Sequence, residues 1–211
     1  MTSKLHLAQH CCTLLFIAFF TATLCGQSIK MGLQTGVNMS GLQISSHLDL
    51  NPDDKMLPGS QCNLFFEYKF GSLPISISSE PGVIQKGFIF KNGNEGWYKT
   101  RLNYLNLPTV FNYYPGKRLG VSIGAELNYL VSIVQNGKKM GFSDFRYERT
   151  EVAGTARLSY RVYKKWTLGT SYTMGITPLY KIYTADENGM RNGHITGRNF
   201  STQVYVRYVL N

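Results

Sequence analysis

The chain has 211 residues, of which 43% are hydrophobic, 13% aromatic and 16% charged, with a formal net charge of +10 at pH 7. Charged residues are scarce, because soluble domains carry about 25% of them. The mean hydropathy of −0.16, and the lack of any run of about 18 apolar residues beyond the N-terminus, exclude a bundle of membrane helices. Abundant aromatic and β-branched residues exclude disorder. The composition indicates one domain, or at most two, rich in β-structure.

Residues 1–26 are predicted to be a signal peptide, which is removed from the mature protein. Lys4 supplies the positive charge at its start, and residues 14–20 form an apolar stretch too short to span a membrane. Small residues follow, so cleavage is expected after Cys25 or Gly26. The alternative is a lipoprotein cut directly before that cysteine, although a leucine stands where a small residue is wanted. Both readings predict an exported protein.

Export leaves one cysteine in the mature chain, Cys62, so no internal disulfide can form, and no metal-binding spacing is present. Cys62 is expected to act as a small apolar side chain on a strand. Loss of Lys4 lowers the formal charge from +10 to +9. This surplus attracts anions. In an exported protein we expect lipid phosphates or acidic glycans rather than nucleic acid, and no cofactor.

Apolar and polar side chains alternate with a period of two along most of the mature chain, as in half-buried β-strands. The clearest stretch is 119–134, where the polar face carries Gly, Ser, Glu and Asn, with Leu130 and Val134 as exceptions. Its apolar face consists of Leu119, Val121, Ile123, Ala125, Leu127, Tyr129, Val131 and Ile133. Residues 166–177 and 199–210 repeat the pattern. The chain is therefore predicted to be all-β.

Eight strands follow from these runs, and the connections between them alternate in length. The predicted strands are Ile29–Met39, Gln61–Phe70, Leu73–Gln85, Arg101–Tyr114, Leu119–Val134, Val152–Tyr163, Trp166–Thr177 and Asn199–Leu210. The long connections are Ser40–Ser60, Lys86–Thr100, Gln135–Glu151 and Pro178–Arg198, and the short ones are 71–72, 115–118 and 164–165.

Four long connections interleaved with three tight turns are typical of outer-membrane barrels. We predict that residues 27–211 form an eight-stranded antiparallel up-and-down transmembrane β-barrel in the bacterial outer membrane. It has four long outer loops and three short periplasmic turns, and both termini lie in the periplasm. The alternative is a secreted, lipocalin-like barrel, which shows the same alternation with its apolar face inward.

Two observations favour lipid on the apolar face. The polar face holds many Gly, Ser and Thr residues, which suit the narrow interior of an eight-stranded barrel. Bulky aromatic residues stand on the apolar face, several of them at strand ends, where interfacial girdles of Tyr and Trp lie. They are Phe65 or Phe66, Tyr68, Phe111, Tyr113, Tyr129, Tyr160, Trp166, Tyr172 and Tyr208.

One segment has a recurring family pattern: Tyr104-Leu105-Asn106-Leu107-Pro108, followed by an apolar run that ends in Tyr113-Tyr114. It resembles the fourth strand of the PorT-like outer-membrane β-barrel proteins of Bacteroidetes. Upstream, Glu80 and then Gln85-Lys86-Gly87 are similar to the family's glutamate and lysine–glycine. Downstream, residues 121–130 resemble its glycine-bearing fifth strand. The specific motifs cover about a third of the mature chain.

The resemblance implies an integral outer-membrane barrel without known catalytic residues. One branch of the family takes part in type IX secretion, which implies secretion proteins as partners. Two departures stand out, because the family's acid is Asn106 here and the chain ends in Asn211 rather than Phe. The first puts a shared charge network in doubt, and the second weakens the signal for barrel insertion.

Several charged residues fall on the predicted lumen face, and they carry the main site hypothesis. They are Lys30, Glu67, Lys69, Glu80, Glu126, Arg157, Arg161 and Arg207. One interpretation is an ion path. The other is a plug, because the interior of an eight-stranded barrel is narrow and unpaired buried charge is costly. We expect Glu80 and Glu126 to pair with Arg157 and Arg207.

The predicted outer loops offer two weaker candidates. His47 lies near serines and an aspartate, as a lipid-modifying hydrolase would need, but sequence neighbours form no catalytic triad by themselves. Lys138, Lys139, Arg146 and Arg149 of the third loop could bind lipid A phosphates. Interspersed acidic residues favour an ordinary solvated loop instead.

The sequence therefore predicts a monomeric, non-enzymatic barrel in contact with outer-membrane lipid. Its loops would act as a binding surface, or as part of an envelope or secretion assembly. Three alternatives stay open: a narrow solute or proton channel, a lipid-modifying enzyme, and a soluble barrel that encloses an apolar ligand.

Overall fold

The structure is a computed structural model. It describes residues 29–45, 55–91, 96–141, 147–185 and 191–210, and of residues 181–185 and 191–194 only the backbone. The predicted signal peptide lies outside these residues. Among the described residues, none forms a helix with the length and hydrophobicity that membrane crossing requires. The strands are β1 (Ile29–Ser45), β2 (Lys55–Lys69), β3 (Ile75–Ser79), β4 (Gly82–Lys91), β5 (Trp97–Tyr113), β6 (Leu119–Gln135), β7 (Lys138–Met140), β8 (Thr150–Tyr163), β9 (Trp166–Gly175), β10 (Tyr180–Ala185) and β11 (Arg191–Val209).

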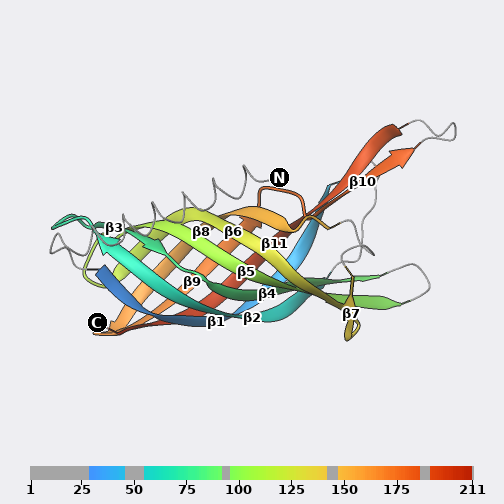
Figure 1. Cartoon of the computed structure of the whole chain (residues 1–211). Helices are drawn as coiled ribbons and strands as arrows, with labels where there is room; N and C mark the ends of the chain where they lie inside the picture. Colours follow the sequence, from blue (N-terminus) through green and yellow to red (C-terminus); the bar gives the residue numbers. More distant parts are fainter. Residues whose placement is uncertain (1–28, 46–54, 92–95, 142–146, 186–190, 211) are drawn as a thin grey trace, which may run out of the picture.

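The strands form a closed antiparallel barrel (Figure 1). β1 pairs with β2 on one side and with β11 on the other, which closes the sheet on itself. From β2 the ring continues through β3 and β4, then β5, β6, β8 and β9, back to β11. With β3 and β4 counted as one wall strand, the ring has eight strands, so the predicted eight-stranded antiparallel barrel is confirmed.

The third wall strand is broken at Glu80 and Pro81, where the sequence predicts one strand over residues 73–85. The two residues opposite on β5, one of them Pro108, also lie outside the regular pairing. The carbonyl of Pro108 accepts a hydrogen bond from the Glu80 amide at 2.9 Å. Because proline has no amide hydrogen to donate to a neighbouring strand, the regular pairing is interrupted opposite Pro108, at Glu80 and Pro81. Glu80 keeps the inward face that Ser76 and Ser78 share.

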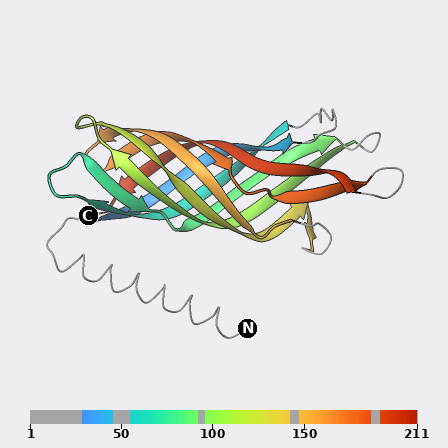
Figure 2. The same cartoon turned by 90° about the horizontal axis from the view of Figure 1, so that it is seen from above.

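The strands extend further toward the end with the long connections than the sequence predicts. β4 continues to Lys91 and β5 begins at Trp97, so most of the predicted loop 86–100 is a hairpin. Most of the predicted loop 178–198 is strand as well, because β10 pairs with the first half of β11. Figure 2 shows these hairpins extending beyond the barrel wall. The loop assignments were wrong here.

A third hairpin joins β6 to β7 within the predicted loop 135–151. Asn136 and Gly137 both have positive φ, 48° and 82°, as a two-residue type I′ turn requires. The flanking Gln135 and Lys138 pair directly. An Asn-Gly pair between alternating residues is a strong hairpin signal, and it marks this turn in the sequence.

The outer surface of the wall is apolar and the lumen is polar. On β6, Val121, Ile123 and Val131 are exposed, whereas Ser122 and Glu126 are buried. The exposed fraction is 65% for Ile123 and 1% for Glu126. A soluble barrel with an apolar interior would show the opposite pattern, so the secreted-barrel alternative is wrong. The apolar face is the lipid-facing surface of a membrane barrel.

Two residues predicted to face lipid lie inside instead. Ile133 is fully buried because the pairing between β5 and β6 shifts by one residue beside Tyr104, which leaves Val131 as the extra residue of a bulge. Of the two phenylalanines considered for the outer face, Phe65 is fully buried. Gly32 makes room for it, since a Cβ there would lie 2.6 Å from the Phe65 ring.

Candidate functional site in the barrel lumen

Glu80 lies at the centre of a buried ion-pair network. Its carboxylate oxygens are 2.5 Å from Arg157 Nη1 and 2.5 Å from Arg207 Nη2. Gln34 and Ser78 also donate hydrogen bonds to it, at 3.2 and 3.3 Å. Glu80 is completely buried, and it lies between β3 and β4, opposite the arginines of β8 and β11. Three wall strands are thereby joined across the lumen.

Glu126 of β6 lies between this cluster and a second one. Its Oε1 is 3.7 Å from Arg157 Nη2 and accepts a hydrogen bond from the Thr173 hydroxyl at 3.0 Å. Its Oε2 is 4.0 Å from Lys86 Nζ. The carboxylate therefore has a cation on each side.

The second cluster is formed by Lys86 of β4 and Glu151 of β8, whose Nζ and Oε1 are 2.9 Å apart. The Tyr104 hydroxyl lies 3.4 Å from Glu151 Oε2, and Asn128 donates to Oε1 at 3.2 Å. Asn199 donates hydrogen bonds to both Glu151 and Tyr104. All five side chains are buried, so this network also crosses the lumen.

Sequence reasoning missed this second cluster because it placed Lys86 and Glu151 at the edges of long loops. Both residues lie within wall strands. A signal was present for Glu151, because steps of two residues back from Arg157 lead to it on the same face. Lys86 was noted for the family pattern alone.

The charges that are joined by ion pairs balance one another. Three carboxylates, those of Glu80, Glu126 and Glu151, face the three cations of Lys86, Arg157 and Arg207. Transfer of an ion from water into a protein interior costs several kcal/mol even after relaxation. The network therefore fills the lumen at no net charge, with each ion beside an opposite one.

The other residues predicted for the lumen network lie outside these ion pairs. Glu67 accepts hydrogen bonds from the hydroxyls of Ser76 and Tyr114, both at 2.7 Å. The Arg161 side chain is half-buried and, among the described residues, has neither a hydrogen bond nor an ion pair. Lys69 lies 6.0 Å from the Tyr114 ring. The predicted set thus divides between the middle of the lumen and the end with the tight turns.

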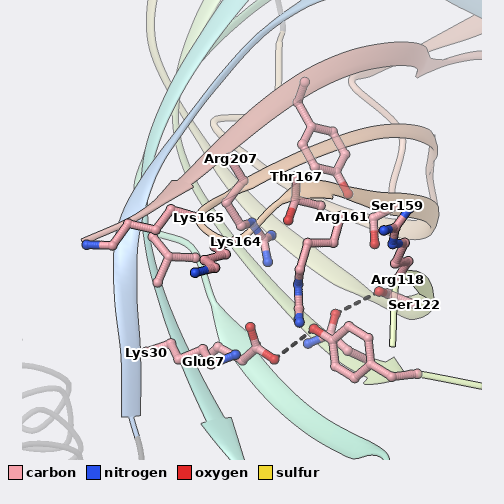
Figure 3. Close-up of a pocket in the computed structure, with 14 residues that line it drawn as sticks. Lys30, Glu67, Arg118, Ser122, Ser159, Arg161, Lys164, Lys165, Thr167 and Arg207 are labelled. Atoms are coloured by element: carbon pink, nitrogen blue, oxygen red, sulfur yellow. Dashed lines mark hydrogen bonds between the residues drawn. The ribbon is translucent and has the colours of Figure 1, made fainter. Parts of the chain in front are cut away.

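The two ends of the lumen differ in chemistry. Toward the long connections the network is covered by a buried apolar cluster. Its residues are Leu42, Ile84, Phe88, Leu102, Tyr104, Leu130, Ile133 and Leu179. At the end with the tight turns a cavity of about 280 Å³ opens instead, and six of its fourteen lining residues are cationic (Figure 3). We call this cavity, lined by Lys30, Glu67, Asn112, Tyr114, Arg118, Ser122, Ser159, Arg161, Lys164, Lys165, Thr167, Tyr205, Arg207 and Val209, the vestibule.

The loop candidates are only partly within the described residues. Lys138 and Lys139 are exposed on β7, and Arg149 is exposed just before β8. Arg146 and His47 lie outside the described residues. In the same region Tyr147 is half-buried beside Tyr180, with ring centroids 6.1 Å apart, and burial raises the pKa of Tyr147 to about 12.

No three His, Cys, Asp or Glu side chains of the described part of the chain converge as metal ligands. Cys62 is exposed on the outer wall, among apolar lipid-facing residues. The arrangement in the lumen can hold charges in fixed pairs, and the vestibule can attract anions.

A closed antiparallel barrel with an apolar outer wall and a polar, filled lumen is an integral outer-membrane barrel. The sequence matches the family described as "Outer membrane protein beta-barrel domain" over residues 25–181. The chain belongs to that family and is a bacterial outer-membrane β-barrel protein. A search of the curated proteins gives no match.

Several solved structures are similar to this chain. Neisserial surface protein A (NspA) is 14% identical, with 86% of this chain and 99% of that chain covered and a TM-score of 0.45. Ail, the attachment invasion locus protein of Yersinia pestis, is 12% identical, with 86% and 99% covered and a TM-score of 0.42. The outer membrane protease OmpT from Escherichia coli is 9% identical, with 86% and 95% covered and a TM-score of 0.39.

Proposed function

We propose that this protein is a non-enzymatic outer-membrane barrel that serves as a binding or assembly component of the cell envelope. The observation that carries the proposal is the filled lumen. Its middle is crossed by a buried, charge-balanced network, and an apolar cluster covers that network toward the long connections. A lumen of this kind holds the barrel together and conducts poorly. We therefore assign binding to the surfaces at the two ends of the barrel.

The end with the long connections is the surface we assign to partners, and we orient it outward, with both termini in the periplasm. Its hairpins are ordered β-structure that presents aromatic and basic side chains. Phe90 stacks on Tyr98 with ring centroids 5.5 Å apart, and Lys55 Nζ lies 4.1 Å from the centre of the Trp97 ring. Trp97 is exposed, whereas Phe90 and Tyr98 are half-buried, and exposed aromatic residues supply large contact area in protein interfaces.

A finer form of the proposal places the chain among the PorT-like barrels, with secretion or other envelope proteins as partners. The residues that carry the resemblance support it, because Glu80, Lys86 and Tyr104 all take part in the buried networks. Asn106, where the family has an acid, accepts a hydrogen bond from Asn63 at 3.3 Å. The shared residues thus belong to the lumen framework.

Lipid A phosphates are the lipid ligand we propose for the outer end. Lys138 and Lys139 are adjacent and exposed on β7, with Arg149 exposed nearby in the chain, and Arg146 belongs to the same segment. Each cation near an anionic membrane surface contributes about 1 kcal/mol. Removal of two cations, about 2 kcal/mol together, should therefore weaken binding to lipid A roughly 30-fold.

The first test is conductance of the refolded full chain in planar bilayers. We expect no steady current, and a steady open current would show that the lumen is a channel. The second test is binding to lipid A vesicles. K138Q/K139Q should bind roughly 30-fold more weakly, whereas K69Q/K117Q, which removes the same charge at the opposite end, should bind as the unmodified chain does. Equal binding by both variants would remove lipid A from the proposal and leave the protein partners.

A further inference from the structure

The vestibule is a strongly cationic cavity. Six cationic side chains line it, and Glu67 is the one carboxylate in its lining. The cations are Lys30, Arg118, Arg161, Lys164, Lys165 and Arg207. They come from β1, β8, β11 and two tight turns, so the closure of the barrel brings them together. Figure 3 shows their side chains around one opening.

Internal pairing accounts for only part of this charge. Glu67 is engaged by the hydroxyls of Ser76 and Tyr114, and Arg207 at the inner end is engaged by Glu80 and Gln34. Arg118 donates to the Tyr160 hydroxyl, a neutral group, at 3.2 Å, and Lys165 donates to a backbone carbonyl at 3.1 Å. The Glu67 carboxylate offsets one cation at the mouth of the vestibule, its cross-strand neighbour Lys30, and none of these contacts neutralises the other lysines and arginines there.

Three cations have side-chain donors left over. Within the described residues, the side chains of Lys30, Arg161 and Lys164 make no hydrogen bond and no ion pair. Arg161 is half-buried on the inner face of β8, so its guanidinium is held inside the vestibule. The hydroxyls of Ser159 and Thr167 also line the cavity and add neutral donors.

We propose that the vestibule binds a multiply charged oxyanion of the phosphate class. A tetrahedral oxyanion presents several acceptor oxygens to converging donors, and arginine forks match this geometry. The cavity holds about 280 Å³, enough for one or two phosphoryl groups and too little for a folded partner. The buried pair of Arg207 and Glu80 forms its inner end, so the anion would be held at the mouth and would not pass through.

The test uses the refolded full chain in zwitterionic nanodiscs, with inorganic phosphate and pyrophosphate as probes in isothermal titration calorimetry. We expect saturable binding, tighter for pyrophosphate, and none for chloride at equal ionic strength. K30Q/R161Q should weaken binding tenfold or more, because it removes two charge-assisted contacts. K117Q is the matched control, since Lys117 is exposed in the tight turn next to Arg118 and does not line the vestibule. It should bind within about twofold of the unmodified chain.

Nanodiscs that contain phosphatidylglycerol identify the source of the oxyanion. If a lipid headgroup fills the vestibule, inorganic phosphate should bind to the zwitterionic nanodiscs and be displaced in the anionic ones. If the ligand is a soluble phosphate, both nanodiscs should give the same affinity. No saturable binding in either, equal losses in K30Q/R161Q and K117Q, or tighter binding of an acidic peptide than of pyrophosphate would each overturn the proposal. A fluorescence unfolding curve confirms that the variants are folded before titration.

Discussion

The middle of the lumen and the vestibule contain the same kinds of charged residue, but these residues differ in burial and in pairing. In the middle, Arg157 and Arg207 are buried and each lies 2.5 Å from a Glu80 oxygen. In the vestibule, Arg161 is half-buried on the same face of β8, four residues from Arg157, without an ion pair among the described residues. Water can solvate Arg161 but not the buried Arg157 and Arg207.

Depth in the barrel therefore decides what a lumen charge can do. A buried charge must be paired, so it becomes part of the framework and is costly to change. A charge at the mouth keeps its hydration, is free of a fixed partner, and can exchange water for a ligand. The long-connection end adds a third environment, because its apolar cluster contains no ion pair. The predictions below test this division by burial.

Glu80 should show the largest effect. E80A would leave Arg157 and Arg207 buried without their main partner, and breaking such a pair costs about 3–5 kcal/mol of the free energy of unfolding. Urea unfolding in phospholipid vesicles, followed by tryptophan fluorescence, measures this. E148A is the matched control, because Glu148 is exposed and should change stability by less than about 0.5 kcal/mol. Equal stability of the two variants would show that the network is not structural.

The Lys86–Glu151 pair should behave as a coupled unit. K86M and E151Q should each cost about 3 kcal/mol, because each leaves a buried charge without its partner at 2.9 Å. The double variant should cost less than the sum by about 1–3 kcal/mol. K86M combined with E67Q, near the other end of the lumen, is the control and should be additive within about 0.5 kcal/mol. Additivity in both cycles would contradict the pairing.

Tyr205 separates the two regions, and its fit against Gly169 should have an intermediate effect. A Cβ on Gly169 would lie 2.3 Å from Cζ of Tyr205, which is buried beside Arg157 and Arg207. G169A should therefore cost about 1–3 kcal/mol through overpacking. G116A is the control, because no atom lies within 4 Å of a Cβ there, and it should leave the unfolding midpoint unchanged. A neutral G169A would mean that Tyr205 moves readily.

The barrel could be predicted from the sequence because its signal is local. A period of two repeats along each strand, and tight turns alternate with long connections. The polar lumen face of β6 follows from that pattern as far as Asn128. The bulge beside Tyr104 breaks the pattern. It brings both Leu130 and Ile133 inward, and nothing in the alternation marks a one-residue shift.

For the site, the sequence predicts the kinds of residue on the lumen face but not their depth or their contacts. Alternation places Arg157 and Arg161 on one face but carries no information about depth, so the two look equivalent in the sequence. Lys86 and Glu151 are 65 residues apart, and their contact depends on a barrel closure that joins β4 to β8 across the lumen. Glu80 is the intermediate case, because alternation places it on the buried face of Ser76 and Ser78, whereas its arginine partners come from strands distant in the sequence.

Arg161 should show the smallest effect on stability, and it is the sharpest test of the division by depth. R161Q should change the free energy of unfolding by no more than about 0.5 kcal/mol, as expected for a solvated charge without an ion pair. R207Q, the same substitution on a buried cation of the lumen, should cost about 3 kcal/mol. At low salt R161Q should raise the free energy of unfolding by a few tenths of a kcal/mol, because Lys30 and Arg118 line the same cavity and repel the charge of Arg161. That gain should vanish at 1 M salt, where the screening length falls to about 3 Å. A loss as large as that of R207Q would mean that the vestibule charges are structural too, and the distinction between the two regions would fail.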